Sequence, residues 1–289
     1  MRSNGSMQKI DWNINTSAAF CPGNPPITAL KPLFPWAGSK NRHFGIYQPL
    51  LPDMSKVNRY HEPCIGSASF FFNLRRQGFK GAAHLNDMNE KMIKCYQGIK
   101  ENPSRVIEHF QELERRHNKD LFFNMRHAFN SSWSNEHLAG WFIYLARGAY
   151  RGVYRENRQG ICTSAPRNIL NILDPSLIYM ASMAFQNTEL AYGDFGNVLA
   201  KARANDFVFM DPPYPDCFSK YTALGFSTFD HHRLAYVCRT LDRKKALFMQ
   251  TNADCQLIRD LYNNFNIKSV VTPRKICHGT GREVVIMNY

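Results

Sequence analysis

The sequence has no cysteine pattern typical of a metal site or a disulfide framework. Its eight cysteines are scattered, with no CxxC pair and no histidine at zinc-ligand spacing. They are Cys21, Cys64, Cys95, Cys162, Cys217, Cys238, Cys255 and Cys277. We therefore expect reduced thiols and no bound metal. His231 and His232 open a predicted helix without a carboxylate or cysteine at ligand spacing, so we interpret them as surface or capping residues.

Long apolar runs are also missing. No window approaches the roughly twenty apolar residues of a membrane span, and residues 1–26 lack the apolar stretch of a signal peptide. We expect a soluble, cytoplasmic protein that makes no membrane contact. The chain is nevertheless 44% hydrophobic over 289 residues. That is enough for the core of one large domain, or of a catalytic domain with a smaller inserted one.

Acidic residues are few relative to basic ones. The chain has 23 Asp and Glu residues against 36 Lys and Arg residues, which gives a formal net charge of +13. Such a charge predicts a positive field that attracts a polyanion such as nucleic acid. A basic surface that only aids solubility is the alternative explanation.

The order of predicted elements indicates an α/β fold. Residues 1–30 have few periodic apolar positions, which predicts a flexible arm with no catalytic role. Strand patterns then cover 59–62, 82–85, 188–192, 206–210, 245–251, 267–272 and 283–288. Helical patterns between them cover 68–77, 89–100, 231–241 and 254–264. This alternation predicts a Rossmann-like, mostly parallel sheet, and the last two strands predict an antiparallel hairpin at its edge.

A block of different character interrupts this alternation. Helical spacing covers 104–116, 120–130 and 136–147, and a loop rich in Arg, Gly and Asn follows over 147–167. The block is typical of an insertion. We expect a catalytic domain formed by 31–100 and 185–289, with a mainly helical inserted domain at 101–184.

A hydrophobic strand leads directly into Asp211, Pro212, Pro213 and Tyr214. Ligands of open α/β sheets bind at the carboxyl ends of the strands, so this tetrapeptide should lie at the mouth of a cleft. A carboxylate and a backbone carbonyl can accept both hydrogens of an exocyclic amine and make it a better nucleophile, while an aromatic ring stacks on the base. An ordinary strand-ending turn is the alternative, because Asp and Pro are common turn residues.

Two further segments predict a cofactor site. Small residues after the first strand, around Gly66, allow a ligand to approach a helix N-terminus, although the absence of GxGxxG argues against NAD. Asp87 ends the next strand, where doubly wound folds place an acid for ribose hydroxyls, with helix capping as the alternative. Ahead of the first strand, Trp36 could wall a cofactor's methionine portion and Lys40 could bind a carboxylate, although a lone Trp is more often a core residue.

Together these motifs resemble the Dam-type DNA N6-adenine methyltransferases of the alpha arrangement. The shared order is Trp-Ala-Gly-x-Lys from Trp36, Glu-Pro-x-x-Gly-x-x-Ser from Glu62, Asn-Asp-x-Asn from Asn86, and Asp-Pro-Pro-Tyr from Asp211. The resemblance covers about residues 31–289 and is patchy in the insertion. It implies that the insertion is a target recognition domain. It also implies S-adenosylmethionine as cofactor and double-stranded DNA as partner, in the cytoplasm of a bacterium or a virus-infected cell.

The resemblance carries specific roles onto this chain. The implied catalytic residues are Asp211, Pro212 and Tyr214, with the target adenine flipped out of the duplex against Tyr214. The implied cofactor-binding residues are Trp36, Ala37, Gly38, Lys40, Glu62, Pro63, Gly66, Ser67, Ser69, Asp87, Met88 and Asp211. Asp87 would bind the ribose, and Asp211 would contact both cofactor and adenine. No metal is needed, because the methyl donor is already activated by its positive sulfur.

The stretch 150–160 interleaves aromatic residues with arginines and matches the family's recognition hairpin by position. The implied DNA-binding residues of this stretch are Tyr150, Arg151, Arg155 and Asn157, with Arg155 as the best candidate for a guanine contact. Arg282, in the C-terminal turn 275–282 with Gly279 and Gly281, is predicted to contact the DNA backbone. Arg151 stands where GATC-reading members usually carry Asn, and the run 163–167 also departs from the family. The target is therefore GATC or a relaxed variant.

Two alternatives stay open. Methyltransferases of RNA adenine or of protein glutamine use a related x-Pro-Pro-Tyr motif, although the basic insertion favours DNA. A catalytically silent nucleic-acid-binding relative is the second alternative, and the intact Asp211 and Tyr214 argue against it. The sequence leaves the oligomeric state open.

Overall fold

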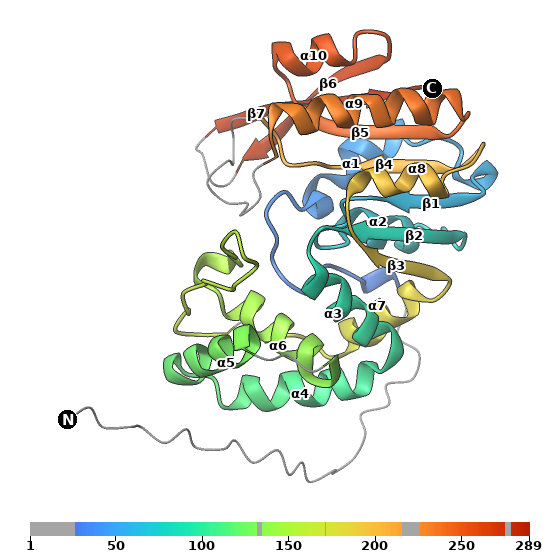
Figure 1. Cartoon of the computed structure of the whole chain (residues 1–289). Coiled ribbons are helices and arrows are strands. Elements are labelled where there is room, and N and C mark those ends of the chain that lie inside the picture. Colours follow the sequence, from blue (N-terminus) through green and yellow to red (C-terminus); the bar gives the residue numbers. More distant parts are fainter. Residues whose placement is uncertain (1–26, 132–134, 171, 216–225, 275–278) are drawn as a thin grey trace.

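A computed structural model describes residues 27–131, 135–170, 172–215, 226–274 and 279–289 of the chain (Figure 1). The predicted arm over 1–30 lies almost wholly outside these residues. Within the described part, no helix is both long and apolar enough to cross a membrane.

Seven strands of the described residues form one sheet in the order β3-β2-β1-β4-β5-β7-β6. Their bounds are β1 Arg59–Glu62, β2 Ala82–Asp87, β3 Thr188–Tyr192, β4 Phe207–Met210, β5 Leu247–Ala253, β6 Asn266–Arg274 and β7 Gly279–Met287. Neighbours from β3 to β5 are parallel, whereas β7 pairs antiparallel with both β5 and β6. The predicted α/β fold with a C-terminal antiparallel hairpin is confirmed.

The strand order reverses direction between β1 and β4. From β1 the chain continues through β2 to β3 on one side, and β4 and β5 then extend the sheet on the other side of β1. Such a switch point opens a crevice at the carboxyl ends of the two central strands. The turn after Glu62 and the motif at Asp211 therefore begin side by side.

Helices cover both faces of the sheet, which explains why β4 is a continuous apolar run. Phe207 and Phe209 point into one hydrophobic cluster, while Val208 and Met210 point into the other. The first cluster includes side chains of α2 Ser69–Arg76, α3 Glu90–Glu101 and α7 Ser176–Phe185. The second includes side chains of α8 Val198–Lys201, α9 Thr228–Arg243 and α10 Gln256–Leu261.

The insertion folds into the predicted helices, which gather at the β3 side of the sheet (Figure 1). They are α4 Pro103–Arg115, α5 Lys119–Ser131 and α6 Asn135–Gly148. Helix α6 packs against α3 and α4, and its apolar residues belong to the same cluster as those beneath the sheet. The division at 101–184 remains a prediction, because a continuous core joins the two parts.

Short helical turns complete the described chain. They are η1 Ile27–Ala29, η2 Lys40–His43, α1 Phe44–Tyr47, η3 Gln48–Leu50, η4 Met54–Lys56, η5 Tyr150–Gly152 and η6 Phe195–Asn197.

Some predictions differ from the structure for identifiable reasons. Helix α7 was not predicted, because its apolar residues face all directions and produce little periodicity. Helix α9 begins earlier than predicted, since Ser227 and Asp230 form a capping box. The surface interpretation is wrong for His231, which is 1% exposed although it lies in the first turn of α9.

Candidate active site

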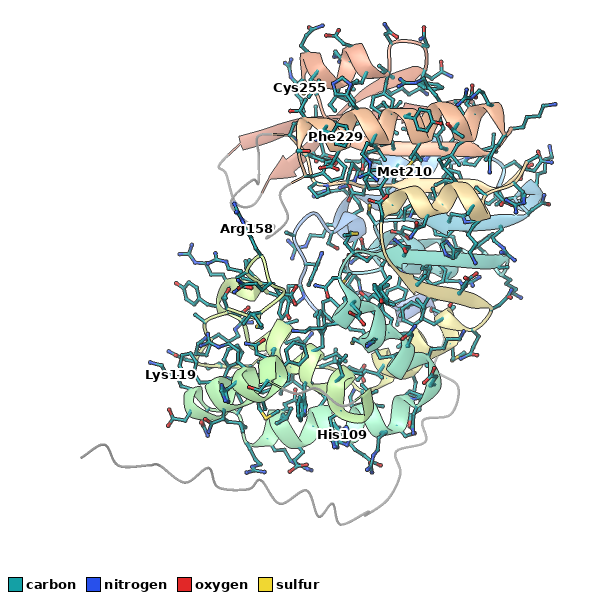
Figure 2. The ribbon with its side chains drawn as sticks, viewed as in Figure 1. His109, Lys119, Arg158, Met210, Phe229 and Cys255 are labelled. Atoms are coloured by element: carbon teal, nitrogen blue, oxygen red, sulfur yellow. The ribbon has the colours of Figure 1, made fainter. Side chains whose placement is uncertain are left out.

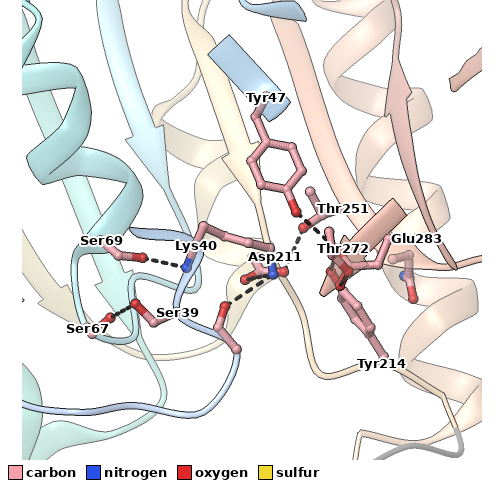
Figure 3. A network of polar contacts seen from close by, with 12 residues as sticks. Ser39, Lys40, Tyr47, Ser67, Ser69, Asp211, Tyr214, Thr251, Thr272 and Glu283 are labelled. Carbon is pink, nitrogen blue, oxygen red and sulfur yellow. Dashed lines mark hydrogen bonds and ion pairs between the residues drawn. The ribbon is translucent and has the colours of Figure 1, made fainter. Parts of the chain in front are cut away.

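Two hydrogen bonds join the segment before β1 to the turn after β1 and to the start of α2, and a third lies within that segment. The backbone N–H of Lys40 donates to Ser69 Oγ at 3.0 Å, and Ser67 Oγ donates to Ser39 Oγ at 3.2 Å. The Lys40 ammonium donates to the carbonyl of Gly38 at 3.2 Å, which requires the left-handed backbone of this glycine at φ +77°. These contacts aim Lys40 at the carboxyl end of β4 (Figure 3).

Gly66 lies between Trp36 and Asp87. Its φ is +48°, and a Cβ on it would lie 3.1 Å from Trp36 Cδ1. Its N–H donates to Asp87 Oδ2 at 2.9 Å, and its carbonyl accepts from Tyr96 Oη at 2.6 Å. A glycine is needed here for the conformation and also for the close approach of the indole ring.

Gly66→Ala should weaken S-adenosylmethionine binding several-fold and destabilise the fold by about 1 kcal/mol or more, because it adds strain at positive φ and displaces Trp36. Calorimetric titration and thermal melting would measure both effects. Gly78→Ala is the matched control, since Gly78 has φ +92° with open space around its Cβ position. If the two variants bound S-adenosylmethionine with equal affinity, Gly66 would not be needed to place Trp36 at the cofactor site.

Asp87, at the carboxyl end of β2, accepts hydrogen bonds through both of its carboxylate oxygens. Its Oδ2 accepts from Gly66, and its Oδ1 accepts from the N–H of Asn89 at 3.0 Å. Burial raises the pKa of Asp87, although these backbone donors act in the opposite direction. Each carboxylate oxygen keeps a further lone pair that a ribose hydroxyl can use.

The surroundings of Asp87 fit an adenosine group. Asn86 donates to the carbonyls of Pro63 at 3.1 Å and Gly193 at 2.8 Å, and so joins the ends of β1, β2 and β3. Met88 and Tyr192, which follow β2 and end β3, are each 58% exposed. Such apolar surface beside a carboxylate suits a purine and its ribose.

Asp211 connects three elements. Lys40 Nζ donates to its Oδ2 at 2.7 Å, and Thr251 Oγ1 on β5 donates to its Oδ1 at 2.6 Å (Figure 3). Its side chain is 17% exposed. Burial raises the pKa of Asp211, while the charge and hydrogen bond of Lys40 and the hydrogen bond of Thr251 oppose the rise.

Tyr214 lies beside this ion pair. The Lys40 ammonium lies 5.1 Å from the centre of the Tyr214 ring, and the Tyr214 hydroxyl donates to Glu283 Oε2 on β7 at 3.0 Å. Pro212 is buried. The structure therefore brings Lys40, Asp211 and Tyr214 together. The predicted contact of Lys40 with a carboxylate of the cofactor stays a prediction.

Other predicted cofactor residues make internal contacts. Glu62 is 2% exposed and accepts from Tyr60 Oη at 2.7 Å, so its carboxyl group faces the core. Pro63 is buried, whereas Ala37 and Gly38 are exposed beside Lys40. Ser67 and Ser69 make the contacts to the segment before β1 described above.

The predicted recognition stretch forms a loop with two isolated bridges, Ala149 with Pro166 and Glu156 with Cys162. Tyr150 is 57% exposed, and Arg151 adopts φ +56°. Arg151 and Arg155 are both exposed.

The side chain of Asn157 shapes this loop. Its Oδ1 accepts from the N–H groups of Gln159 at 2.9 Å and Ile161 at 3.0 Å. The predicted DNA contact of Asn157 would therefore have to coexist with a turn-forming role.

The loop also contacts the cofactor motifs. Glu156 Oε2 accepts from Asn89 Nδ2 at 3.1 Å, and Lys91 Nζ donates to the carbonyl of Gly160 at 2.9 Å. The Tyr154 ring stacks on Trp36 with centroids 5.9 Å apart. The segment that is predicted to read DNA is thus fixed to the segments that are predicted to bind the cofactor.

Arg282 is exposed on β7, where its carbonyl accepts from the N–H of Asp254 at 3.3 Å. Residues 275–278 of the C-terminal turn 275–282 lie outside the described residues. Tyr221, a loop aromatic that the sequence offered for closing over the cofactor or the base, also lies outside them.

Sequence reasoning missed two residues of this site, Thr251 and Glu283. The signal for Glu283 was present, since it is a single acid at the start of the apolar run 284–287. Thr251 carries no such signal, because threonine is an ordinary strand residue.

Comparison with known proteins identifies the family of this chain. The family model of the D12 class N6 adenine-specific DNA methyltransferases matches residues 36–276. Type II methyltransferase M1.LlaDCHI of Lactococcus lactis subsp. cremoris is 30% identical over 278 residues, covering 90% of this chain and 96% of the relative. Type II methyltransferase M.MjaIII of Methanocaldococcus jannaschii is 31% identical over 288 residues, covering 90% of this chain and 99% of the relative.

A third relative, the retron Ec67 DNA adenine methylase of Escherichia coli, is 29% identical over 245 residues, covering 83% of this chain and 84% of the relative. The resemblance inferred from the sequence motifs is confirmed. Since the family model spans most of the chain and two relatives match over nearly their whole length, the chain belongs to the D12 class of N6-adenine-specific DNA methyltransferases, with S-adenosylmethionine as methyl donor.

Proposed function

We propose that this enzyme methylates the exocyclic amino group of adenine in duplex DNA, after flipping the base out of the helix. The observation that carries the proposal is the position of Asp211, between Lys40 and Thr251 and beside the Tyr214 ring. Asp211 provides a proton acceptor and Tyr214 provides an aromatic surface, both at the switch point of the sheet.

Asp211 acts on the target amine in this proposal. Its carboxylate accepts one amine hydrogen and the carbonyl of Pro212 accepts the other, which favours the tetrahedral nitrogen that attack requires. Lys40 and Thr251 each occupy one side of the carboxylate, so Asp211 is held in one orientation before the base arrives. Tyr214 stacks on the adenine ring.

The bound cofactor supplies a methyl group activated by its positively charged sulfur. Asp87 would hold the ribose hydroxyls, Met88 would cover the purine, and Trp36 would wall the methionine portion. Gly66 links Asp87 to Trp36, because its N–H donates to Asp87 and its backbone lies against the indole ring.

Base flipping is part of the proposal because an amine within a duplex cannot reach a buried carboxylate. The exposed ring of Tyr150 is the candidate for the space that the extruded adenine leaves. A net charge of +13 supports attraction to the phosphate backbone.

Arg155 is proposed to read a guanine within GATC or a relaxed variant of it. Arg155→Ala should therefore lose discrimination at one base pair, by about 1–3 kcal/mol, because a bidentate base contact disappears. Sequencing of methylated adenines in treated plasmid DNA would give the preferred site.

Arg158→Ala is the control for this prediction. Arg158 is exposed and extends away from α5 and α6 at the outer part of the loop (Figure 2). Its loss should weaken binding to all sequences alike and reduce the salt dependence. An unchanged recognition site in the Arg155 variant would remove Arg155 from the reading of sequence.

The function is tested by incubation with labelled S-adenosylmethionine and duplex DNA, RNA or peptide. Label should enter duplex DNA at adenine N6. Label in RNA alone or protein alone would support a methyltransferase of RNA adenine or protein glutamine, and binding without transfer would support a silent relative. Such an enzyme would act on DNA in the cytoplasm of a bacterium or a virus-infected cell.

A further inference from the structure

Glu283 is a buried carboxylate that accepts hydrogen bonds from three hydroxyl groups. Tyr47 and Tyr214 both donate to its Oε2 at 3.0 Å, and Thr272 donates to its Oε1 at 2.9 Å (Figure 3). The residue is only 9% exposed. A carboxylate so enclosed is held rigidly, because moving it would leave buried hydroxyls without an acceptor.

The chemistry of this cluster defines the direction of each hydrogen bond. The Tyr214 hydroxyl donates to Glu283 Oε2. Burial raises the pKa of both Tyr47 and Tyr214, which keeps the two phenols protonated as donors. The far end of the Tyr214 side chain is therefore anchored to β7.

Asp211, at the other end of the Asp-Pro-Pro-Tyr motif, is anchored to β5, the strand next to β7. Asp211 accepts from Thr251 on β5, while Tyr214 donates to Glu283 on β7. These strands pair directly, with Ala253 opposite Glu283. The antiparallel hairpin at the sheet edge thus supplies the second of two anchor points for the catalytic segment.

Lys40 limits the remaining freedom of the ring. Its ammonium lies 5.1 Å from the ring centre while it also binds Asp211 at 2.7 Å. One side of Tyr214 therefore contacts a cation and its hydroxyl contacts a carboxylate. Rotation of the ring would break at least one of these contacts.

We propose that Glu283 is a positioning residue, which fixes the position of the Tyr214 ring through its hydroxyl so that the ring can stack on the target adenine. This inference rests on the proposed function, in which Tyr214 is the stacking surface. Glu283 contacts neither base nor cofactor in this account and acts only through the Tyr214 hydroxyl.

The variant Glu283→Gln tests this role with little change of shape. It replaces one acceptor oxygen by a donating NH2 group and leaves the other as an uncharged, weaker acceptor. We expect kcat/KM for duplex DNA to fall about tenfold, a modest loss for a misplaced stacking group. The affinity for S-adenosylmethionine should stay within about twofold, because the cofactor residues are untouched. With 2-aminopurine at the target position, the fluorescence of the complex should differ from that of the wild-type complex.

The matched control is Thr272→Val, which removes one donor to the same carboxylate and leaves the Tyr214 contact intact. It should lower thermal stability and reduce kcat/KM much less than Glu283→Gln does, because Tyr47 and Tyr214 still contact Oε2. An equal loss of activity in this variant would mean that the carboxylate is only structural, and would overturn the proposal.

A double-mutant cycle with Tyr214→Phe gives the decisive result. This change removes only the hydroxyl that contacts Glu283, so the double variant should be no slower than the slower single variant. Independent, multiplying losses would overturn the proposal. Wild-type activity and wild-type fluorescence in the Tyr214→Phe variant would also overturn it. This variant tests the proposal even if Glu283→Gln does not fold.

Failure of this proposal and failure of the proposed function give different results. If Glu283→Gln retains full activity while Asp211→Ala is inactive on duplex DNA, only the role of Glu283 is overturned. If the wild-type enzyme transfers no label to duplex DNA, the proposed function itself is overturned, and this inference with it.

Discussion

Asp211→Ala should lower methyl transfer to duplex DNA by about 10²–10⁴-fold, the range typical of a lost general acid–base group. The variant removes the acceptor of the amine hydrogen and leaves Lys40 and Thr251 without their shared partner. DNA binding should survive, because removing a carboxylate makes the site more positive. Single-turnover transfer rates and duplex affinity would separate the two effects.

Asp206→Asn is a matched control at the other end of β4. Asp206 precedes this strand and contacts His61 Nε2 at 2.9 Å, away from Lys40 and Tyr214. The control should reduce stability more than the transfer rate of folded enzyme. If Asp211→Ala turns over at the wild-type rate, the proposed mechanism is wrong.

The dependence of kcat/KM on pH should reflect the ionisation of Asp211. Burial raises the pKa of Asp211 above its ordinary value. Protonation would remove the negative charge and turn one acceptor oxygen into a donor, so the ionised form is the active one. Activity should therefore be present above this raised pKa and fall as the pH drops through it. The acidic limb of kcat/KM should lie above the ordinary aspartate pKa of about 3.9, and Asp211→Asn should lack it.

Phe209→Ala should have the largest effect on stability, reducing the free energy of unfolding by about 3–5 kcal/mol. Phe209 is 1% exposed in β4, and its ring stacks on Phe70 with centroids 3.5 Å apart and an interplanar angle of 9°. Truncation would leave a cavity between the sheet and α2. Denaturant unfolding would measure the change through a lower midpoint at constant m-value.

Phe229→Ala is the control for this change, since Phe229 is 71% exposed at the start of α9 (Figure 2). Its effect should stay within about 0.5 kcal/mol. A loss below about 1 kcal/mol in Phe209→Ala would mean that the core repacks around the missing ring.

The fold could be predicted to a large extent because its patterns are local. The first strand was predicted with the observed bounds, Arg59–Glu62, and the third with the bounds Thr188–Tyr192. Alternation of such strands with amphipathic helices is sufficient to predict a mostly parallel sheet. Helix α7 was missed for the complementary reason, since a helix buried on several sides has no polar face to reveal its period.

The candidate site could be predicted only where its residues form compact motifs. Lys40, Asp87, Asp211 and Tyr214 lie in three of the four short motifs whose order indicated the family. The inward orientation of Glu62 and the turn-forming contacts of Asn157 were not predictable, because they depend on neighbours that the fold brings to them.

The sequence by itself determined the chemistry of this protein: a carboxylate, two prolines and an aromatic ring at the end of an apolar strand. Only the tertiary structure decided how those groups are held. Lys40 meets Asp211 across 171 positions of sequence, and Glu283 meets Tyr214 across 69. Local periodicity carries no information on such distant pairs, because they form only when strands far apart in the chain become neighbours in the sheet.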